Sequence, residues 1–268
     1  MSETVVPVVR SERRPRRSLA RYVPPALVVV VTIAVWEAVI RIFDVPTYIW
    51  SSPSLIAQTI VEEYADLLTH SLVTLTETLV GFAFAVFFGL AFGLLLHFST
   101  MAKRALYPLL IASQSIPTVV LAPVFVLILG FGLWPKVAVV ALFCFFPIVV
   151  GTIDGLTGVD REYIRLMLTL DATRFGIFRR VEFPAALPQI FTGTRVAATY
   201  AAIGAVFGEW AGSQSGLGWQ MLQAKGRLDT ALVFADIVFI TVMALGLFGL
   251  VSLVERLTIP WARKGGLT

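Results

Sequence analysis

The sequence is poor in charged residues and in the side chains that carry out chemistry. Charged residues make up 14% of its 268 positions and hydrophobic residues 57%, and the mean hydropathy is +0.86. Soluble domains carry about 25% charged and about 45–50% apolar residues. This composition excludes an ordinary soluble enzyme and predicts an integral membrane protein, and we expect no nucleic acid among its partners.

Residues that could bind a metal or a nucleotide are few. The single cysteine, Cys144, lies within the apolar run VAVVALFCFFPIVV, and one cysteine can form neither an intrachain disulfide nor a cysteine metal cluster. His70 and His97 lie near opposite ends of one apolar run, too far apart in a straight helix to share a metal ion. No His-Glu-x-x-His pair occurs, and no lysine follows a glycine as in a phosphate-binding loop. We therefore predict no catalytic residue, no metal and no cofactor bound by this chain.

Long apolar runs dominate the sequence. They cover residues 23–43, 71–98, 106–132, 133–154, 189–209 and 231–256. A helix that crosses the hydrocarbon core needs about 20 predominantly apolar residues, which each run provides. The sequence therefore predicts an all-α integral membrane protein of about six transmembrane helices. We assign 1–22 to a basic N-terminal tail, 23–260 to the transmembrane domain with a loop at 155–188, and 261–268 to a C-terminal tail.

Basic residues are concentrated on one predicted side of the membrane. With the N-terminus inside, the inner segments contain Arg10, Arg13, Arg14, Arg16, Arg17, Arg21, Lys103, Arg104, Arg161, Arg165, Arg174, Arg179, Arg180, Arg256, Arg263 and Lys264. The outer segments contain only Arg41, Lys136, Lys225 and Arg227. Because lysine and arginine favour the cytoplasmic side, we expect both termini in the cytoplasm. The tail lacks a cleavage site and is interpreted as retained, with binding to anionic membrane lipid as a second interpretation.

The third apolar run contains the strongest helix breakers. Pro117 and Pro123 lie inside it, near the polar residues Ser113, Gln114 and Ser115. Proline removes a backbone hydrogen bond and clashes with the preceding turn, so we expect a broken or kinked helix. Non-helical backbone at membrane depth needs cover from protein or from a water-filled cavity. Ser113, Gln114 and Ser115 are therefore candidate lining for a substrate pathway, and a purely structural kink is the alternative.

Small residues recur at four-residue spacing in GLAFG (89–93) and GAVFG (204–208). In lipid, this spacing allows two helices to approach each other closely. We interpret both stretches as helix packing sites.

Ionisable residues within the apolar runs are costly and by default suggest function. Glu37 and Arg41 are four residues apart and can pair on one helix face. Glu77 fits either a pathway gate or a hydrogen bond between helices. Arg195, near the inner end of the fifth run, can brace the neighbouring loop or reach lipid phosphates.

Two acidic residues flank the stretch WAGSQSGLGW (210–219), which we expect to re-enter the membrane or to cap the outer mouth. Glu209 precedes this stretch and Asp236 begins the sixth run. They form either an outer gate or solvated helix ends. Tyr200 and Glu209 join the candidate pathway residues. Few charges lie in the middle of the runs, which suits a small polar or aromatic heterocycle better than a strongly charged ion.

The loop at 155–188 has apolar residues at steps of three and four. These are Ile164, Leu168, Ala172, Phe175 and Phe178. The spacing predicts one face of an amphipathic helix, which Pro184 and Pro188 are expected to end before the next span. Arg165, Arg174, Arg179 and Arg180 fall outside that face. The helix either lies on anionic lipid or docks into a groove on a cytoplasmic partner.

The loop ends in VEFP (181–184) and continues as FPAALPQIFTGTRVA and GEWAGSQSGLGWQMLQA, and it is preceded by SQSIPTVVLAPVFVLILGFG and FFPIVVGTIDGL. Together these stretches resemble ABC transporter permeases of the binding-protein-dependent type, in the nitrate, sulfonate, taurine and pyrimidine-precursor group. The family pattern reads Glu-Ala-Ala, three residues, Gly, nine residues, Ile-x-Leu-Pro. Aligned at its end, it places the glycine at Asp171 and Glu-Ala-Ala at Arg165, Leu166 and Met167. The resemblance covers about residues 50–260.

The resemblance implies a type I ABC importer-like permease in the bacterial inner membrane. Its loop would be a coupling helix that inserts into a cytoplasmic ABC ATPase, and ATP and Mg would bind that partner. The coupling residues so implied are Arg165, Leu168, Asp171, Ala172, Arg174, Phe175, Phe178, Arg179, Arg180 and Pro184. Two copies of the chain would form one pathway that works by alternating access. A periplasmic or lipid-anchored substrate-binding protein would deliver the solute.

The expected solute is a thiamine-pyrimidine precursor or a similar vitamin-like compound, ahead of a sulfonate or nitrate. One alternative function is an ion-coupled carrier or channel, which predicts inverted repeats and paired midplane carboxylates. Another is an intramembrane enzyme, which needs a serine–histidine or paired-aspartate constellation. Both alternatives predict function without an ATPase, and neither pattern is clear in this sequence.

Overall fold

The structure is a computed structural model that describes residues 23–263, all of whose regular elements are helical. The predicted N-terminal tail and residues 264–268 lie outside the described residues. Five helices are long and apolar enough to cross a membrane, or six if one bent pair counts as a single span. They are α1 (Val23–Ile42), α3 (Tyr64–Phe98), α6 (Leu133–Thr157), α9 (Phe183–Gly212, continuous with the short helix before it) and α11 (Thr230–Thr258), with α4 (Thr100–Ser113) and α5 (Thr118–Leu129) as the bent pair.

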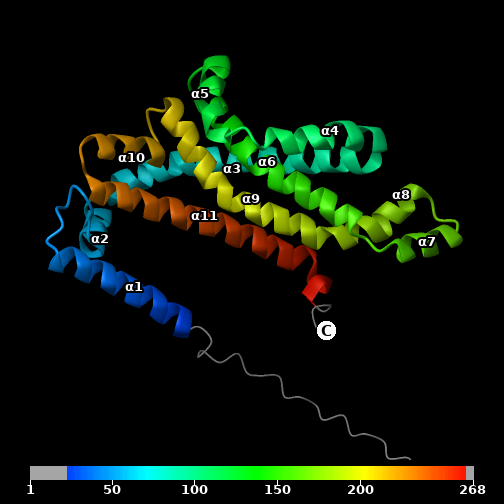
Figure 1. Ribbon diagram of the computed structural model, residues 1–268, viewed down its shortest axis with the longest axis horizontal. Coiled ribbons are helices and arrows are strands. Elements are labelled where there is room, and N and C mark those ends of the chain that lie inside the picture. Colours follow the sequence, from blue (N-terminus) through cyan, green and yellow to red (C-terminus); the bar gives the residue numbers. More distant parts are fainter. Residues whose placement is uncertain (1–22, 264–268) are drawn as a thin grey trace, which may run out of the picture.

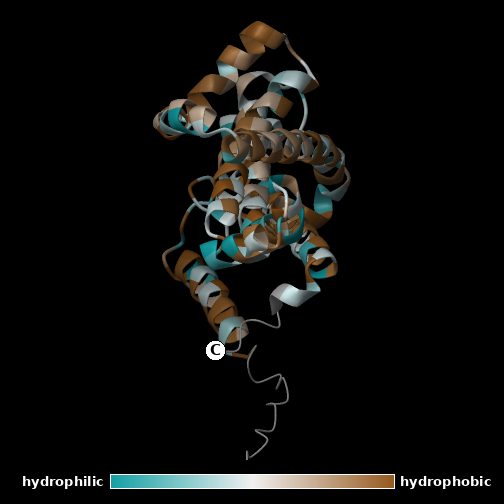
Figure 2. Ribbon diagram, turned by 90° about the vertical axis from the view of Figure 1, so that its right-hand side faces the viewer, coloured by the Kyte–Doolittle hydropathy of each residue, from teal (hydrophilic) through white to brown (hydrophobic). Residues whose placement is uncertain are grey.

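The short elements lie at the two ends of the elongated bundle (Figure 1). At one end are α2 (Pro53–Glu62) and α10 (Leu217–Gly226), and at the other are α7 (Arg161–Thr169) and α8 (Arg174–Ile177). A π-helical turn, Phe178–Glu182, joins α8 to α9, and a 3₁₀ turn, Pro260–Arg263, follows α11. We refer to these as the α10 end and the α7 end. Most residues of the long helices are hydrophobic, as the brown ribbon in Figure 2 shows. This composition is expected for helices that face lipid.

Three long helices form the core, with α6 in contact with both α3 and α9. Glycines lie at several of their closest contacts, because a side chain there would collide with the neighbouring helix. A Cβ on Gly89 of α3 would lie 2.8 Å from Cγ2 of Ile148, and one on Gly93 would lie 2.7 Å from Cβ of Thr152. The same close approach occurs between α6 and α9, where a Cβ on Gly204 would lie 3.0 Å from the Cα of Val140. The packing role predicted for both four-residue spacings is confirmed.

The third apolar run breaks as predicted, at residues 114–117. The axes of α4 and α5 differ in direction by 100° across this break, and Pro117 occupies the N-cap position of α5 in an extended conformation. Pro123, which was also expected to disturb the run, lies inside α5 without ending it. Gln114 and Ser115 are exposed at the break. We call residues 113–118 the elbow.

The first helix diverges from the rest of the bundle, and most of its apolar side chains are exposed (Figure 1). It is held at its C-terminal end, where Arg41 Nε pairs with Glu37 Oε1 at 2.6 Å. Glu37 also accepts hydrogen bonds from the backbone N–H and the hydroxyl of Ser54, at 3.0 and 2.8 Å. The predicted pair on one helix face is confirmed, and it ties α1 to the start of α2.

Candidate functional site

The segment at the α7 end is two helices joined by a turn. Asp160 caps α7, its carboxylate accepting from the N–H of Glu162 at 2.9 Å, and Thr173 caps α8 in the same manner. Between them Asp171 adopts a left-handed conformation, with φ of +53°. This region of backbone space favours glycine, although aspartate tolerates it better than most residues. The family pattern has its glycine at this position.

The prediction of a single amphipathic helix that Pro184 and Pro188 end is wrong. The helix ends earlier, at the turn around Asp171, and both prolines lie within α9. A proline in the first turn of a helix does not break it, because its missing N–H has no intrahelical partner there. Pro184 occupies such a position, and the preceding π-helical turn leads directly into α9. Leu168 and Phe175 therefore belong to different helices instead of sharing one face.

The surface of this segment is open and combines apolar with basic side chains. None of the residues of α7 is buried in the described chain, and Leu168 and Phe175 are 53% and 67% exposed. Arg165, Arg174, Arg179 and Arg180 are exposed around them, and Ala172 and Pro184 are half-buried. Leaving large apolar side chains exposed to water is unfavourable, and such patches commonly mark binding sites. The segment is therefore suited to a contact with another molecule. We call residues 161–177 the coupling segment.

Phe178 has a different position from the other predicted coupling residues. Its ring packs against Phe98 at the end of α3 with a centroid distance of 4.8 Å, and against Phe183 at 5.6 Å. Beside it, His97 Nε2 lies 3.1 Å from Glu182 Oε2. These contacts fasten the π-helical turn to α3, so Phe178 anchors the coupling segment to the bundle. The His97–Glu182 pair was missed by sequence analysis, since nothing in the spacing of residues 85 positions apart indicates it.

The predicted pathway residues separate into open and buried groups. Tyr200 is 43% exposed and shares an open face of α9 with Val196 and Ile203. Gln114 and Ser115 are exposed at the elbow, whereas Ser113 is half-buried and donates its hydroxyl to the carbonyl of Leu110. No hydrogen bond within residues 23–263 joins Tyr200 to the elbow. One copy of the chain therefore leaves two surfaces open. The elbow carries Gln114 and Ser115, and the face of α9 is mainly apolar, with Tyr200 as its polar residue.

Glu209 does not line an open surface, which corrects its assignment to the pathway. It is 1% exposed, and its carboxylate accepts from Thr74 Oγ1 at 2.6 Å and from the N–H groups of Gly218 and Trp219 at 2.5 and 3.2 Å. The hydroxyl of Thr74 accepts from the N–H of Leu217 at 2.8 Å. Side chains of α3 and α9 thus satisfy the unpaired amides that begin α10. α10 packs against α3, α9 and α11, and the re-entry or capping role expected for this stretch stays a prediction.

Other charged residues at the α10 end are also buried. Lys136 of α6 donates to Glu77 Oε1 of α3 at 2.5 Å, which agrees with the interpretation of Glu77 as a link between helices. Lys136 was assigned to an outer loop, but it is 6% exposed within α6. Asp236 is fully buried and makes no side-chain hydrogen bond among the described residues, so it does not solvate a helix end. The position of Lys136 inside an apolar run was the feature of the sequence that could have indicated its buried pair with Glu77.

Arg195 braces α11 and not the coupling loop. Its Nη1 lies 2.9 Å from Glu255 Oε2, and its Nη2 donates to Thr192 Oγ1 at 3.1 Å. The pair joins α9 to α11 near the α7 end.

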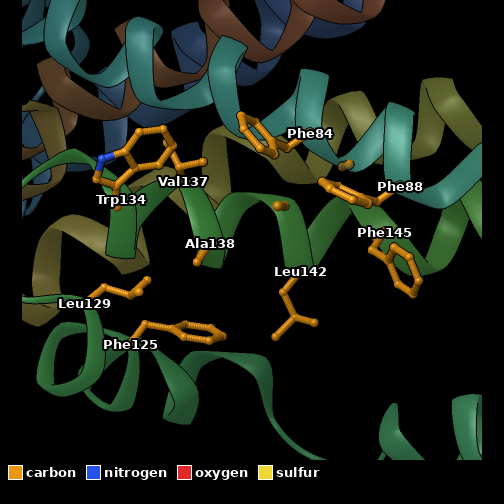
Figure 3. Close-up of a pocket in the computed structure, with 11 residues that line it drawn as sticks. Phe84, Phe88, Phe125, Leu129, Trp134, Val137, Ala138, Leu142 and Phe145 are labelled. Atoms are coloured by element: carbon orange, nitrogen blue, oxygen red, sulfur yellow. The ribbon is translucent and has the colours of Figure 1, made fainter.

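A large cavity of about 520 Å³ lies between α3, α5 and α6. Figure 3 shows Phe84 and Phe88 of α3 and Trp134 of α6 on one side, and Phe125 and Leu129 of α5 on the other. All of its lining side chains are apolar apart from the indole N–H. Trp134 therefore provides the one polar side-chain group in this lining, and a wall of this kind suits a polar solute poorly.

Comparison with known proteins places this geometry in context. The family model for the binding-protein-dependent transport system inner membrane component matches residues 85–260. The formylaminopyrimidine transport permease protein ThiX of Halalkalibacterium halodurans is 36% identical over 240 residues, which cover 90% of this chain and 96% of that protein. The riboflavin transport system permease protein RibX of Chloroflexus aurantiacus is 36% identical over 265 residues, covering 97% and 98%.

A more distant relative is the putative aliphatic sulfonates transport permease protein SsuC of Bacillus subtilis, 29% identical over 251 residues that cover 93% of this chain and 91% of that protein. Among solved structures, inward-facing conformations of the MetNI methionine ABC transporter match with a TM-score of 0.59 at 19% identity, covering 72% of this chain and 98% of that chain. This last likeness concerns the fold. The chain is therefore a multi-pass membrane protein of the type I ABC importer fold and belongs to the family of binding-protein-dependent transport system inner membrane components, the permease subunits of ABC importers.

Proposed function

We propose that two copies of this chain form one solute pathway, and that a pair of cytoplasmic ATPase subunits drives it by docking on the coupling segment. The observation that carries this proposal is the exposure of α7, none of whose residues is buried in the described chain. Its apolar side chains and the arginines around them suit insertion into a groove on a partner. ATP and Mg belong to that partner.

The anchors of the coupling segment support a rigid transmission of movement. The π-helical turn is continuous with α9, and Phe178 and the His97–Glu182 pair fasten this turn to α3. A displacement of α8 by the ATPase therefore moves the base of α9 together with the end of α3. Because α9 carries Tyr200 on its open face, the movement changes which side of the membrane this face opens to, as alternating access requires.

A second copy of the chain explains the exposure of the elbow. Residues 114–117 are non-helical and exposed in one copy, and backbone of this kind does not face lipid within the hydrocarbon core. In a dimer, the elbow and the open face of α9 would line a shared, water-filled pathway. Ser113, Gln114, Ser115 and Tyr200 would then be the side chains that contact the solute.

The solute we propose is a small uncharged or weakly charged heterocycle, such as a pyrimidine precursor of a vitamin. Two relatives that match nearly the whole chain are named for formylaminopyrimidine and riboflavin transport, and the aromatic ring and hydroxyl of Tyr200 suit such a compound. A substrate-binding protein would deliver it on the side of the α10 end. Both termini would then be cytoplasmic, in agreement with the distribution of basic residues.

The docking proposal is tested by purifying the tagged chain from its host and identifying what co-purifies. Leu168→Asp combined with Phe175→Asp places two charges on the open surface and leaves the side chain of Phe178 itself unchanged, although the ring of Phe175 lies 6.4 Å from that of Phe178 between centroids. Met101→Asp is the matched control, because Met101 is 84% exposed at the start of α4, outside the coupling segment. We expect an ATPase subunit with the wild type and the control, and its loss with the double variant. Retention of the ATPase by the double variant contradicts docking at this surface.

The substrate proposal is tested by uptake into proteoliposomes that contain the permease, its ATPase and its binding protein. Labelled aminopyrimidine, riboflavin and taurine are compared at equal concentration. We expect ATP-dependent uptake of a heterocycle, and its reduction by Tyr200→Ala. Uptake of taurine alone would contradict the proposed solute class and would leave the permease function intact.

A further inference from the structure

A second large cavity, of about 410 Å³, lies between α9 and α11 near the α7 end. It differs from the apolar cavity of Figure 3, because polar side chains form much of its wall. The polar residues are Thr192 and Arg195 of α9 and Ser252, Glu255 and Arg256 of α11. The apolar part of the wall includes Phe248 and Ile259.

The cavity has hydrogen-bond donors that the protein does not use. Arg195 has five N–H donors, of which one contacts Glu255 and one contacts Thr192. The hydroxyl oxygen of Ser252 is buried and has no hydrogen-bond partner within residues 23–263. Arg256 is exposed and forms no ion pair with any side chain of the described chain. A buried donor without a partner is costly, so the site is incomplete without a further acceptor.

The charge of the cavity favours an anion as that acceptor. Two arginines and one glutamate line it, and the glutamate is already paired with Arg195 at 2.9 Å. The remaining positive charge is that of Arg256. A tetrahedral oxyanion can accept from a guanidinium group and from a serine hydroxyl at the same time, and such charge-assisted bonds are among the strong ones.

The position of the cavity indicates where the anion comes from. It lies between the two membrane-spanning helices α9 and α11. Figure 1 shows α7 and α8, the helices of the basic coupling segment, at the same end of the bundle. Basic pockets between helices on the cytoplasmic side of a membrane bind phospholipid headgroups. The exposed apolar side chain of Phe248 provides contact for the adjoining acyl chain, which a free inorganic anion lacks.

We propose that the cavity between α9 and α11 binds the phosphate group of an anionic phospholipid, with Arg256, Arg195 and Ser252 as its donors. The bound phosphate would fix the base of α9 relative to α11, next to the contact between Arg195 and Glu255. The proposal does not depend on the identity of the solute or on the docking of an ATPase.

The test uses the purified full chain and two probes. Phosphatidylglycerol is titrated into detergent-solubilised protein and its binding is followed by native mass spectrometry, and inorganic phosphate is titrated by calorimetry. Arg256→Gln removes one positive charge from the cavity, and Arg104→Gln is the matched control because Arg104 is an exposed basic residue outside it. We expect Arg256→Gln to weaken phosphatidylglycerol binding about tenfold, the loss typical of one hydrogen bond to a charged group, and Arg104→Gln to leave it within about twofold.

Ser252→Ala gives a second measurement that changes no charge, and we expect a loss of severalfold in the same titration. Equal affinities in Arg256→Gln, Ser252→Ala and Arg104→Gln would overturn the site. Tight binding of inorganic phosphate that depends on Arg256 would overturn the assignment to lipid and identify a site for a soluble oxyanion. Thermal melting of each variant checks folding, and if Arg256→Gln does not fold, Ser252→Ala decides the outcome.

Discussion

The glycine contacts of α6 make a quantitative prediction for the stability of the bundle. We consider Gly155→Ala, which adds one methyl group where α6 meets α9. The new Cβ would lie 2.7 Å from the carbonyl oxygen of Ala186 and 3.1 Å from its Cβ. Carbon atoms pack favourably at about 3.5–4.0 Å, so the two helices must separate by several tenths of an ångström along a contact that is built from small residues.

The expected cost follows from two opposing effects. Overpacking a well-packed contact costs about 1–3 kcal/mol, whereas replacing glycine by alanine inside a helix stabilises the helix by about 0.5–1 kcal/mol. The net loss for Gly155→Ala is therefore about 0–2.5 kcal/mol, centred on about 1 kcal/mol. Gly246→Ala is the matched control, because Gly246 lies inside α11 and its added Cβ would have no neighbour within 4 Å. That variant should be unchanged or slightly more stable.

The assay is unfolding in a defined detergent mixture, followed by circular dichroism as denaturant is added. We expect Gly155→Ala to unfold at a lower denaturant concentration than the wild type, and Gly246→Ala at an equal or higher one. Gly155→Ala as stable as Gly246→Ala would refute the reasoning, because it would mean that α6 and α9 are not in close contact at this position.

Three further predictions concern buried polar groups and the turn of the coupling segment. Lys136→Met leaves Glu77 without its partner inside the bundle and should lower the free energy of unfolding by about 3–5 kcal/mol. Adding Glu77→Met should recover part of that loss. Additive losses in the double variant would show that the two residues do not interact. Glu209→Gln weakens the acceptor for the amides of Gly218 and Trp219 at the start of α10. Exchange of these two amide hydrogens should therefore accelerate about tenfold or more, and unchanged exchange would show that they do not depend on the carboxylate. Asp171→Gly removes a side chain from a left-handed position and should stabilise the chain by about 0.5–1 kcal/mol in a melting experiment, and destabilisation would contradict the left-handed turn.

Sequence patterns predicted the features that depend on local chemistry. Long apolar runs located the spanning helices, and Pro117 with its polar neighbours located the break between α4 and α5. The pair of Glu37 and Arg41 followed from a spacing of four residues on one helix. The four-residue spacing of glycines predicted close packing, since that effect depends only on the size of the residue.

Features that depend on partners distant in the chain were not predictable. His97 contacts a residue 85 positions away, and Glu209 accepts from Thr74, 135 positions away. Glu209 was assigned to the pathway from its place at a helix end, but its carboxylate is used by the amides of α10. Pro184 was expected to end a helix, and this prediction failed. Proline breaks a helix when it lies in the interior, but it is tolerated in the first turn, where Pro184 lies.

The most direct test of the central claim is chemical cross-linking from the coupling segment. Cys144, the single cysteine of the sequence, is buried, so Leu168→Cys introduces the one readily accessible thiol. A thiol-directed photoreactive reagent is attached there, and its captured partner is identified by mass spectrometry. Leu245→Cys, 65% exposed on α11, is the control. We predict that Leu168→Cys captures an ABC ATPase subunit and that Leu245→Cys does not. Capture of lipid alone at Leu168 would contradict the coupling role of α7.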